Sequence, residues 1–209
     1  MKILIVTSSA QGSASVSSRL AAAFAERLRA AEPGIEIVRR DVGAEPVPHL
    51  TEANVAAIRG KPPETEAERA ALALSDALVA ELREADLVVI GAPMYNFGMA
   101  STLKAWFDHL LRARVTFRYR DDGSVEGLLD NKRAIVIESR AGFYSAGDAA
   151  AMDSQEPHLR TLLGFVGIDD VTFVRAEKLA FGPEAVEASI GAAETQLRDL
   201  AAEPLKLAA

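Results

Sequence analysis

The amino-acid sequence predicts a doubly wound α/β fold, a five-stranded parallel sheet of strand order 2-1-3-4-5 with helices on both faces. Runs such as KILIVT (residues 2–7) and LVVIG (residues 87–91) are apolar almost throughout, as strands buried on both faces are. Segments with helical hydrophobic spacing alternate with these runs along the chain. Right-handed crossover connections then place helices on both faces of one sheet.

The first part of the chain supplies three strands and their crossovers. Apolar residues spaced four apart indicate the longer helices, and Pro33-Gly34 ends the first of them. Residues 41–64 are rich in proline and form a long connection. The expected elements are a strand at 2–7, a helix through Leu20, Phe24 and Leu28, a strand at 35–39, a short helix around 52–59, a helix through Leu74, Leu78 and Leu82, and a strand at 87–91.

The second part continues the alternation after an irregular excursion. Leu103, Phe107 and Leu110 lie on one face of a helix, whereas VTFRY (residues 115–119) and the Asp-Asp-Gly turn after it do not continue that helix. The remaining expected elements are a strand at 134–139, a helix at 158–167, a strand at 171–176 and a helix from about 183 to 200. We find no internal repeat, so residues 1–209 are predicted to form a single domain.

Charge and composition exclude several classes of partner. The net charge is −7 without a basic run, so the surface would not attract a phosphate backbone and no nucleic-acid partner is expected. The longest apolar runs are far shorter than the roughly 20 residues of a membrane span. The chain has no cysteine, and its 3 histidines are too scattered to suggest a metal site. Because no signal peptide is visible, we expect a cytoplasmic protein with small-molecule ligands.

In sheets of this order, ligands bind beyond the carboxyl ends of the strands, near the point where the strand order reverses. This rule selects the loops after the first, third and fourth strands. The first loop (residues 8–18) is rich in serine and lacks the glycine patterns of dinucleotide and nucleoside-triphosphate sites. Its hydroxyls and the amides at the start of the next helix suit a single phosphate, although serines are also ordinary helix caps.

Aromatic and small residues fill the other two loops. The second loop (residues 93–98, PMYNFG) suits a flat aromatic ligand with polar edges, unless it packs under a neighbouring segment. The third loop (residues 139–147) begins SRAG, and its small residues let the backbone approach a ligand edge. Arg140 in this loop is expected at the surface unless it contacts a ligand. A single-phosphate site and a planar-ring site at one sheet edge outline a flavin mononucleotide (FMN).

These residues resemble the FMN-dependent NADH-azoreductases, also called FMN-dependent NADH:quinone oxidoreductases. The resemblance covers essentially the whole chain and rests on APMYNFGMASTLKAWFD (residues 92–108), VTFRY, ESRAG, LGFVGI and FGPE. It implies a flavodoxin-like fold, one FMN per subunit and a homodimer with flavin sites at the subunit interface. The residues matched to FMN contacts are Ser9, Ser15, Val16 and Ser17 for the phosphate, Met94, Tyr95, Asn96 and Phe97 along the ring, and Ser139, Arg140, Ala141 and Gly142 at its edge.

Two of these positions depart from the family pattern. Ala141 stands where the family has glycine, and it would be mildly strained if that position needs a positive φ. Val16 stands where relatives often carry a polar residue. A contact made by the backbone N–H would survive that change.

The resemblance also implies the reaction. NADH, or NADPH, would reduce FMN and leave, and a quinone or azo compound would then take the electrons in a ping-pong cycle, with two cycles needed to cleave an azo bond to amines. No side chain is predicted to act as general acid or base, since hydride chemistry belongs to the flavin. Candidates to line the substrate space, from either subunit, are Phe117, Tyr119, Phe143 and Phe165, although core packing explains them nearly as well. Trp106 is expected to pack within the fold or at a dimer contact.

Two other functions remain open at this point. A flavodoxin-type one-electron carrier would share the fold and the cofactor without turning over a substrate, but it would not need the VTFRY excursion. A flavin-free hydrolase would use Ser9 or Ser139 as nucleophile. No His–Asp pair is legible in the sequence for either serine.

Overall fold

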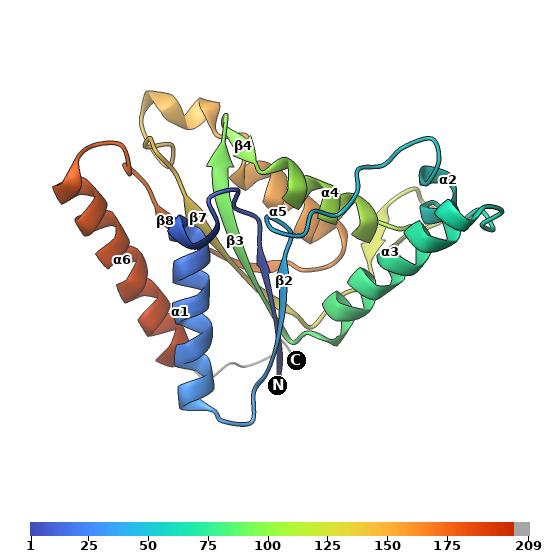
Figure 1. The fold of residues 1–209 in the computed structure, drawn as a ribbon, viewed down its shortest axis with the longest axis horizontal. Coiled ribbons are helices and arrows are strands. Elements are labelled where there is room, and N and C mark those ends of the chain that lie inside the picture. Colours follow the sequence, from blue (N-terminus) through green and yellow to red (C-terminus); the bar gives the residue numbers. More distant parts are fainter. Residues whose placement is uncertain (203–209) are drawn as a thin grey trace.

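The structure is a computed structural model that describes residues 1–202. The end of the predicted domain, residues 203–209, lies outside this part. The strand order β2-β1-β3-β7-β8 confirms the predicted order 2-1-3-4-5 (Figure 1), and each neighbouring pair is parallel. The strands are β1 (Lys2–Thr7), β2 (Glu36–Asp41), β3 (Leu87–Tyr95), β7 (Arg133–Ser139) and β8 (Asp170–Ala176). All carboxyl ends therefore share one edge, the upper edge in Figure 1.

Helices cover both faces of the sheet. One face carries α1 (Val16–Ala31) and α6 (Pro183–Ala202), and the other carries α3 (Glu66–Glu84), α4 (Ser101–Leu110) and α5 (Glu156–Phe165) (Figure 1). Shorter helical segments are η1 (Gly12–Ala14), α2 (Val55–Ile58) and η2 (Asp148–Met152). None of the helices within residues 1–202 is long and apolar enough to cross a membrane.

Two cores follow from the alternation of side chains along each buried strand. In β1, Ile3 and Ile5 point into the core under α1 and α6, whereas Leu4 and Val6 point into the core under α3, α4 and α5. Trp106 is fully buried in the second of these cores, edge to face with Phe107 at 4.9 Å between ring centroids. Burial on both sides is why the strands read as continuous apolar runs in the sequence.

The structure corrects the expected second loop. Met94 and Tyr95 belong to β3, which extends past Pro93 and pairs with a short antiparallel strand, β4 (Gly98–Met99). Asn96 and Phe97 form the two-residue turn between them. The sequence run looked like a loop because it contains proline and asparagine, yet proline is tolerated where a strand leaves its sheet partners.

The VTFRY segment, which was predicted to be irregular, contains regular secondary structure. Strands β5 (Phe117–Tyr119) and β6 (Val125–Gly127) form an antiparallel hairpin that is separate from the main sheet. The hairpin packs beside the C-terminal end of α5, where Leu129 N–H donates to the Val166 carbonyl at 2.9 Å. Three-residue strands are too short to show alternation in the sequence, so this element was missed.

Candidate functional site

The first loop is stabilised by its own serines. Ser15 Oγ accepts a hydrogen bond from the Ser18 N–H at 3.2 Å, which caps α1, and it lies 3.3 Å from Ser17 Oγ. Ser15 and Ser17 are both buried, and the Ser15 hydroxyl serves the capping role that the sequence left open as the simpler explanation, while Ser17 Oγ contacts that hydroxyl.

The backbone at the start of α1 nevertheless fits a phosphate. Helix geometry leaves the N–H groups of Val16 and Ser17 without an acceptor inside the helix. The first turn carries no acidic residue, and the helix dipole adds partial positive charge there. The donors available to one phosphate are thus main-chain groups, which explains why a valine is compatible with this position.

Tyr95 ties the second loop to the first. Its hydroxyl lies 3.1 Å from Ser9 Oγ and accepts a hydrogen bond from the Ala10 N–H at 3.0 Å. Ser9 Oγ also accepts from the Gln11 N–H at 3.2 Å. The two loops therefore meet at the carboxyl edge of the sheet, and the Ser9 hydroxyl has tyrosine and backbone partners rather than the histidine that a hydrolase would need.

The turn of the second loop is strained. Asn96 and Phe97 have φ values of 48° and 71°, as the central residues of a type I′ hairpin turn require. Asparagine tolerates this region, but a bulky residue such as phenylalanine does so at a cost. The strained turn leaves Phe97 41% exposed beside the half-buried Met94 and Tyr95, so the hairpin presents an apolar wall.

The third loop lies against the second. The rings of Phe97 and Tyr144 meet edge to face, with centroids 6.0 Å apart. Gly142 leaves room for this packing, because a Cβ there would lie 2.8 Å from the Tyr144 ring and would require that ring to move. Ala141 is exposed and is not among the residues of positive φ, so the strain considered for it does not arise. Ser139, half-buried, ends β7 at the same edge.

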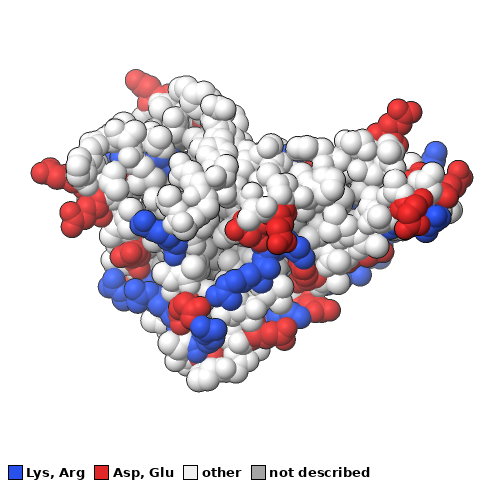
Figure 2. Space-filling view, viewed as in Figure 1, with Lys and Arg blue, Asp and Glu red and all other residues white. Residues whose placement is uncertain are grey.

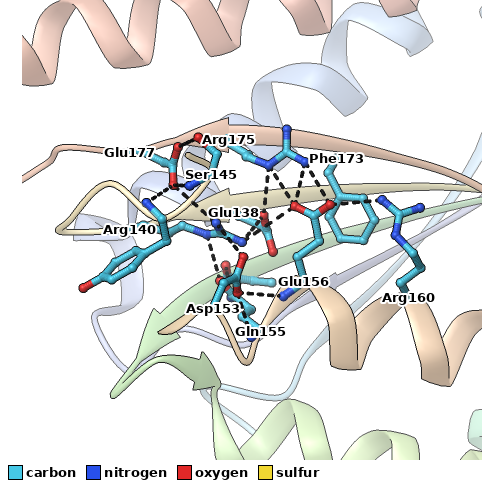
Figure 3. Close-up of polar contacts among 12 residues, drawn as sticks. Glu138, Arg140, Ser145, Asp153, Gln155, Glu156, Arg160, Phe173, Arg175 and Glu177 are labelled. Atoms are coloured by element: carbon cyan, nitrogen blue, oxygen red, sulfur yellow. Dashed lines mark hydrogen bonds and ion pairs between the residues drawn. The ribbon is translucent and has the colours of Figure 1, made fainter. Parts of the chain in front are cut away.

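Arg140 is fully buried, so the expectation that it lies at the surface is wrong. Its guanidinium is surrounded by side chains that come from β7, the start of α5 and the segment after β8 (Figure 3). Its main-chain N–H donates to the Ala176 carbonyl at 2.9 Å. With the side chain enclosed and the N–H occupied, Arg140 contributes to the site through its neighbours.

The buried partners of Arg140 were missed in the sequence, although one signal was present. Glu138 is a charged residue near the end of an otherwise apolar strand, two positions before Arg140 and thus on the same side of the strand. Burial raises the pKa of Glu138 to about 7, because it disfavours the carboxylate more than the adjacent Arg140 guanidinium stabilises it. Glu138 Oε2 accepts from Arg140 Nη2 at 2.6 Å.

The four aromatic candidates for a substrate wall do not lie together. Phe117 is buried against Phe165, with ring centroids 4.7 Å apart, and Tyr119 packs on Phe117 at 5.6 Å. This cluster lies at the C-terminal end of α5, about 15 Å along the helix from its start. Phe143, in contrast, belongs to the third loop, where Lys178 Nζ lies 4.3 Å above its ring.

The surface around the candidate site is poor in charge. On the face shown in Figure 2, the upper middle of the molecule is largely free of lysine, arginine and acidic side chains, whereas acidic side chains lie at its upper left and upper right margins and charges of both signs gather lower down. A cavity of about 380 Å³ lies between α1 and β2 and borders the first loop. It is lined by Ile5, Thr7, Gly12, Ser13, Ser18, Arg19, Ala22, Arg39 and Asp41. No residue of the second or third loop lines this cavity, so it is separate from the apolar wall.

Comparison with known proteins agrees with this geometry. The family model described as a flavodoxin-like fold matches residues 1–201. The chain is 53% identical to the FMN-dependent NADH:quinone oxidoreductase of Hyphomonas neptunium, over 95% of each chain. It is 47% identical to the protein of the same name from Azotobacter vinelandii, over 96% of this chain and 99% of that one.

Solved structures point the same way. The azoreductase from Bacillus anthracis str. Sterne superimposes with a TM-score of 0.86 at 28% identity, covering 96% of this chain and 98% of that one. The FMN-dependent NADH-azoreductase from Bacillus anthracis str. Ames Ancestor, in complex with FMN, gives a TM-score of 0.85 at 26% identity, covering 96% of this chain and 99% of that one. The chain belongs to the flavodoxin-like family and, within it, to the FMN-dependent NADH:quinone oxidoreductases.

Proposed function

We propose that this protein is an FMN-dependent NADH:quinone oxidoreductase that also cleaves aromatic azo compounds to amines. The observation that carries the proposal is the meeting of the three loops at one sheet edge, held by the Ser9–Tyr95 contact and the Phe97–Tyr144 contact. The names of the relatives in Hyphomonas and Azotobacter and of the azoreductase structures support it.

The residues of the three loops fit FMN in different ways. The amides of Val16 and Ser17 would hold the phosphate at the positive end of α1. Met94, Tyr95, Asn96 and Phe97 would flank the ring, and the backbone of Ser139, Ala141 and Gly142 would read its edge. When bound, FMN supplies the hydride chemistry, two electrons in from NADH and two electrons out to a quinone or azo compound.

The chain's own part in the reaction is to position flat ligands and exclude water. The exposed Phe97 ring and the charge-poor surface favour stacking of an aromatic ligand over binding of an ionic one. A donor and an acceptor that bind in turn to the same apolar wall would give ping-pong kinetics. We assign no side chain as general acid or base.

The proposal includes a homodimer with one FMN per subunit. Tyr119 lies on the hairpin at the far end of α5, so it would reach a ring site only as a residue of the partner subunit, whereas Phe117 is buried within its own chain. Tyr119 is 65% exposed and available for such a contact. Light scattering gives the subunit number, and flavin absorbance per polypeptide gives the stoichiometry.

Absorbance spectroscopy tests the function directly. The purified protein should be yellow, NADH should bleach the flavin without oxygen, and a benzoquinone or azo dye should restore the colour. Running the bleaching with NADPH in parallel measures the donor preference. A protein that binds FMN but is not reduced by either nucleotide would instead be a one-electron carrier. Cell fractionation tests the cytoplasmic location, where NADH is supplied.

A further inference from the structure

The Arg140 side chain lies beneath the second and third loops. Its guanidinium nitrogens are connected to the two loops through the side chains of Gln155 and Glu177, and each connection is a hydrogen bond or ion pair (Figure 3). Arg140 and Gln155 are fully buried, and Glu177 is 7% exposed. Charged side chains enclosed to this degree are rare unless paired, which calls for a physical reason for their presence here.

Glu177 connects Arg140 to the third loop. Arg140 Nη1 donates to Glu177 Oε1 at 3.3 Å. The same oxygen accepts from the backbone N–H groups of Tyr144 and Ser145 at 2.8 and 3.1 Å, and Oε2 accepts from the Ser145 hydroxyl at 2.5 Å. The carboxylate thus holds the part of the third loop whose Tyr144 ring contacts Phe97.

Gln155 connects Arg140 to the second loop. Arg140 Nε donates to Gln155 Oε1 at 3.2 Å, which orients the amide so that Nε2 donates to the Ala92 carbonyl at 3.0 Å. Ala92 lies in β3 directly before the second loop. A second hydrogen bond connects the same two segments: the Ser154 N–H donates to the Phe97 carbonyl at 3.0 Å. Both bonds tie the start of α5 to the hairpin that carries the aromatic wall.

The charge of Arg140 is maintained by carboxylates on several elements. Burial works against the charge, but Glu138, Asp153 and Glu177 outweigh it and raise the pKa of Arg140 above its ordinary value. Asp153 Oδ2 lies 3.1 Å from Nη1, and its other oxygen accepts from the Gln155 N–H at 2.8 Å. The planar fork of a guanidinium matches these separated partners, whereas a lysine has a single charged nitrogen.

We propose that Arg140 is a positioning residue, which sets the second and third loops against each other through Gln155 and Glu177 so that they form one ligand-binding wall. This inference rests on the proposed function, since the wall is the one assigned to FMN. It also reassigns Arg140 from contact with the cofactor to support of the residues that contact it.

The test compares Arg140→Ala with Arg175→Ala. Arg175 is a matched control, because it pairs with Glu156 of the same cluster and is 35% exposed, but it has no bond to Gln155 or Glu177 among the described contacts. FMN affinity is measured by flavin fluorescence well below the unfolding temperature of each variant. We expect Arg140→Ala to raise the Kd for FMN about tenfold and to lower kcat/KM for a benzoquinone by up to about 100-fold, with Arg175→Ala within about twofold of wild type.

Guanidinium rescue separates positioning from bulk stability. Arg140→Ala leaves a cavity lined by carboxylates, so millimolar methylguanidinium should restore FMN affinity and kcat/KM in this variant and leave Arg175→Ala unchanged. Arg140→Lys should recover only part of the affinity, because it cannot pair with Gln155 and Glu177 together. An unchanged FMN Kd in folded Arg140→Ala, with only a lower unfolding temperature, would overturn the proposal.

Two further variants keep the test decisive if Arg140→Ala does not fold. Gln155→Met removes the link to Ala92, and Glu177→Gln keeps an acceptor for Tyr144 while removing the charge that faces Arg140. Each should weaken FMN binding several-fold, and wild-type affinity in both would contradict the proposed role. Failure of the underlying function is distinguishable, because it would appear in the wild-type protein as absence of FMN binding or of NADH oxidation.

Discussion

Phe97 combines a strained backbone conformation with an exposed aromatic side chain. Its φ of 71° lies in the left-handed region, which is rare for a bulky side chain. The turn is nevertheless imposed from both sides, since Tyr95 and Gly98 pair across it and the Phe97 carbonyl accepts from the Ser154 N–H. Strain that the surroundings maintain is typical of ligand sites.

This strain predicts an inverted order of stability between two small substitutions. Glycine normally destabilises a position relative to alanine by about 0.5–1 kcal/mol. At residue 97, glycine relieves the positive φ, so Phe97→Gly should be more stable than Phe97→Ala by about 1 kcal/mol. Urea unfolding measures both. Phe143, which is similarly exposed at an ordinary φ, is the control, and there the usual order should hold.

The Tyr95 hydroxyl predicts a second effect at the same scale. Tyr95→Phe removes the partner of both the Ser9 hydroxyl and the Ala10 N–H. A hydrogen bond of this kind contributes about 1 kcal/mol, so the FMN Kd should rise several-fold through displacement of the first loop. Fluorescence titration with FMN measures the change. Thr161→Val, which removes a hydrogen bond to the Pro157 carbonyl on the exposed side of α5, should leave the Kd unaltered.

At the scale of elements, the β5–β6 hairpin is attached to the domain by a close backbone contact. A Cβ at Gly127 in β6 would lie 2.1 Å from the Gly167 nitrogen, in the turn between α5 and β8. Side chains of ordinary size cannot enter that space without moving one backbone away from the other. The hairpin thus depends on a glycine that no sequence motif marks.

Gly127→Ala should therefore destabilise the protein by roughly 1–3 kcal/mol, the usual cost of overpacking. Gly191 in α6 is the control, because a Cβ there meets no atom within 4 Å. Gly191→Ala should stabilise the protein by up to about 1 kcal/mol through helix propensity. Thermal unfolding of both variants checks the prediction, and equal effects would show that the hairpin contact is not tight.

At the scale of the whole molecule, the buried Glu138 links stability to pH. Its pKa is about 7 when folded, compared with 4.5 for an exposed glutamate. Between these values the folded protein binds a proton that the unfolded chain does not, so stability from this group falls as pH rises from about 4.5 to about 7. The loss is on the order of 3 kcal/mol at most.

A comparison with Glu138→Gln isolates this effect from other carboxylates. Glu84 and Glu126 have lowered pKa values, because Lys2 donates to the first and Arg118 to the second. Their contribution to stability therefore increases as pH rises, and it does so at a lower pH than the change at Glu138. The wild-type protein should lose stability relative to Glu138→Gln as pH rises from about 4.5 to about 7, as measured by urea unfolding at several pH values. A constant difference would mean that Glu138 stays ionised.

Much of the fold was predictable because apolar strand runs alternate along the chain with segments of helical hydrophobic spacing. Runs such as KILIVT could be assigned as buried strands, and right-handed crossovers left few topologies for five of them. The three loops followed from the same topology, since parallel strands end at a common edge. The β5–β6 hairpin and the turn at Asn96 and Phe97 could not be read, because short strands and positive φ values leave no periodic pattern.

By itself, the sequence determined which loops meet and which family the chain resembles, because strand order and motif spacing are properties of the chain. Only the tertiary structure decided how the loops hold one another. Ser9 and Tyr95 are 86 residues apart, and Arg140 and Glu177 are 37 apart. Hydrogen bonds and buried charges over such separations depend on distances of a few ångströms that composition and periodicity do not encode, so the role of Arg140 became visible only in the folded molecule.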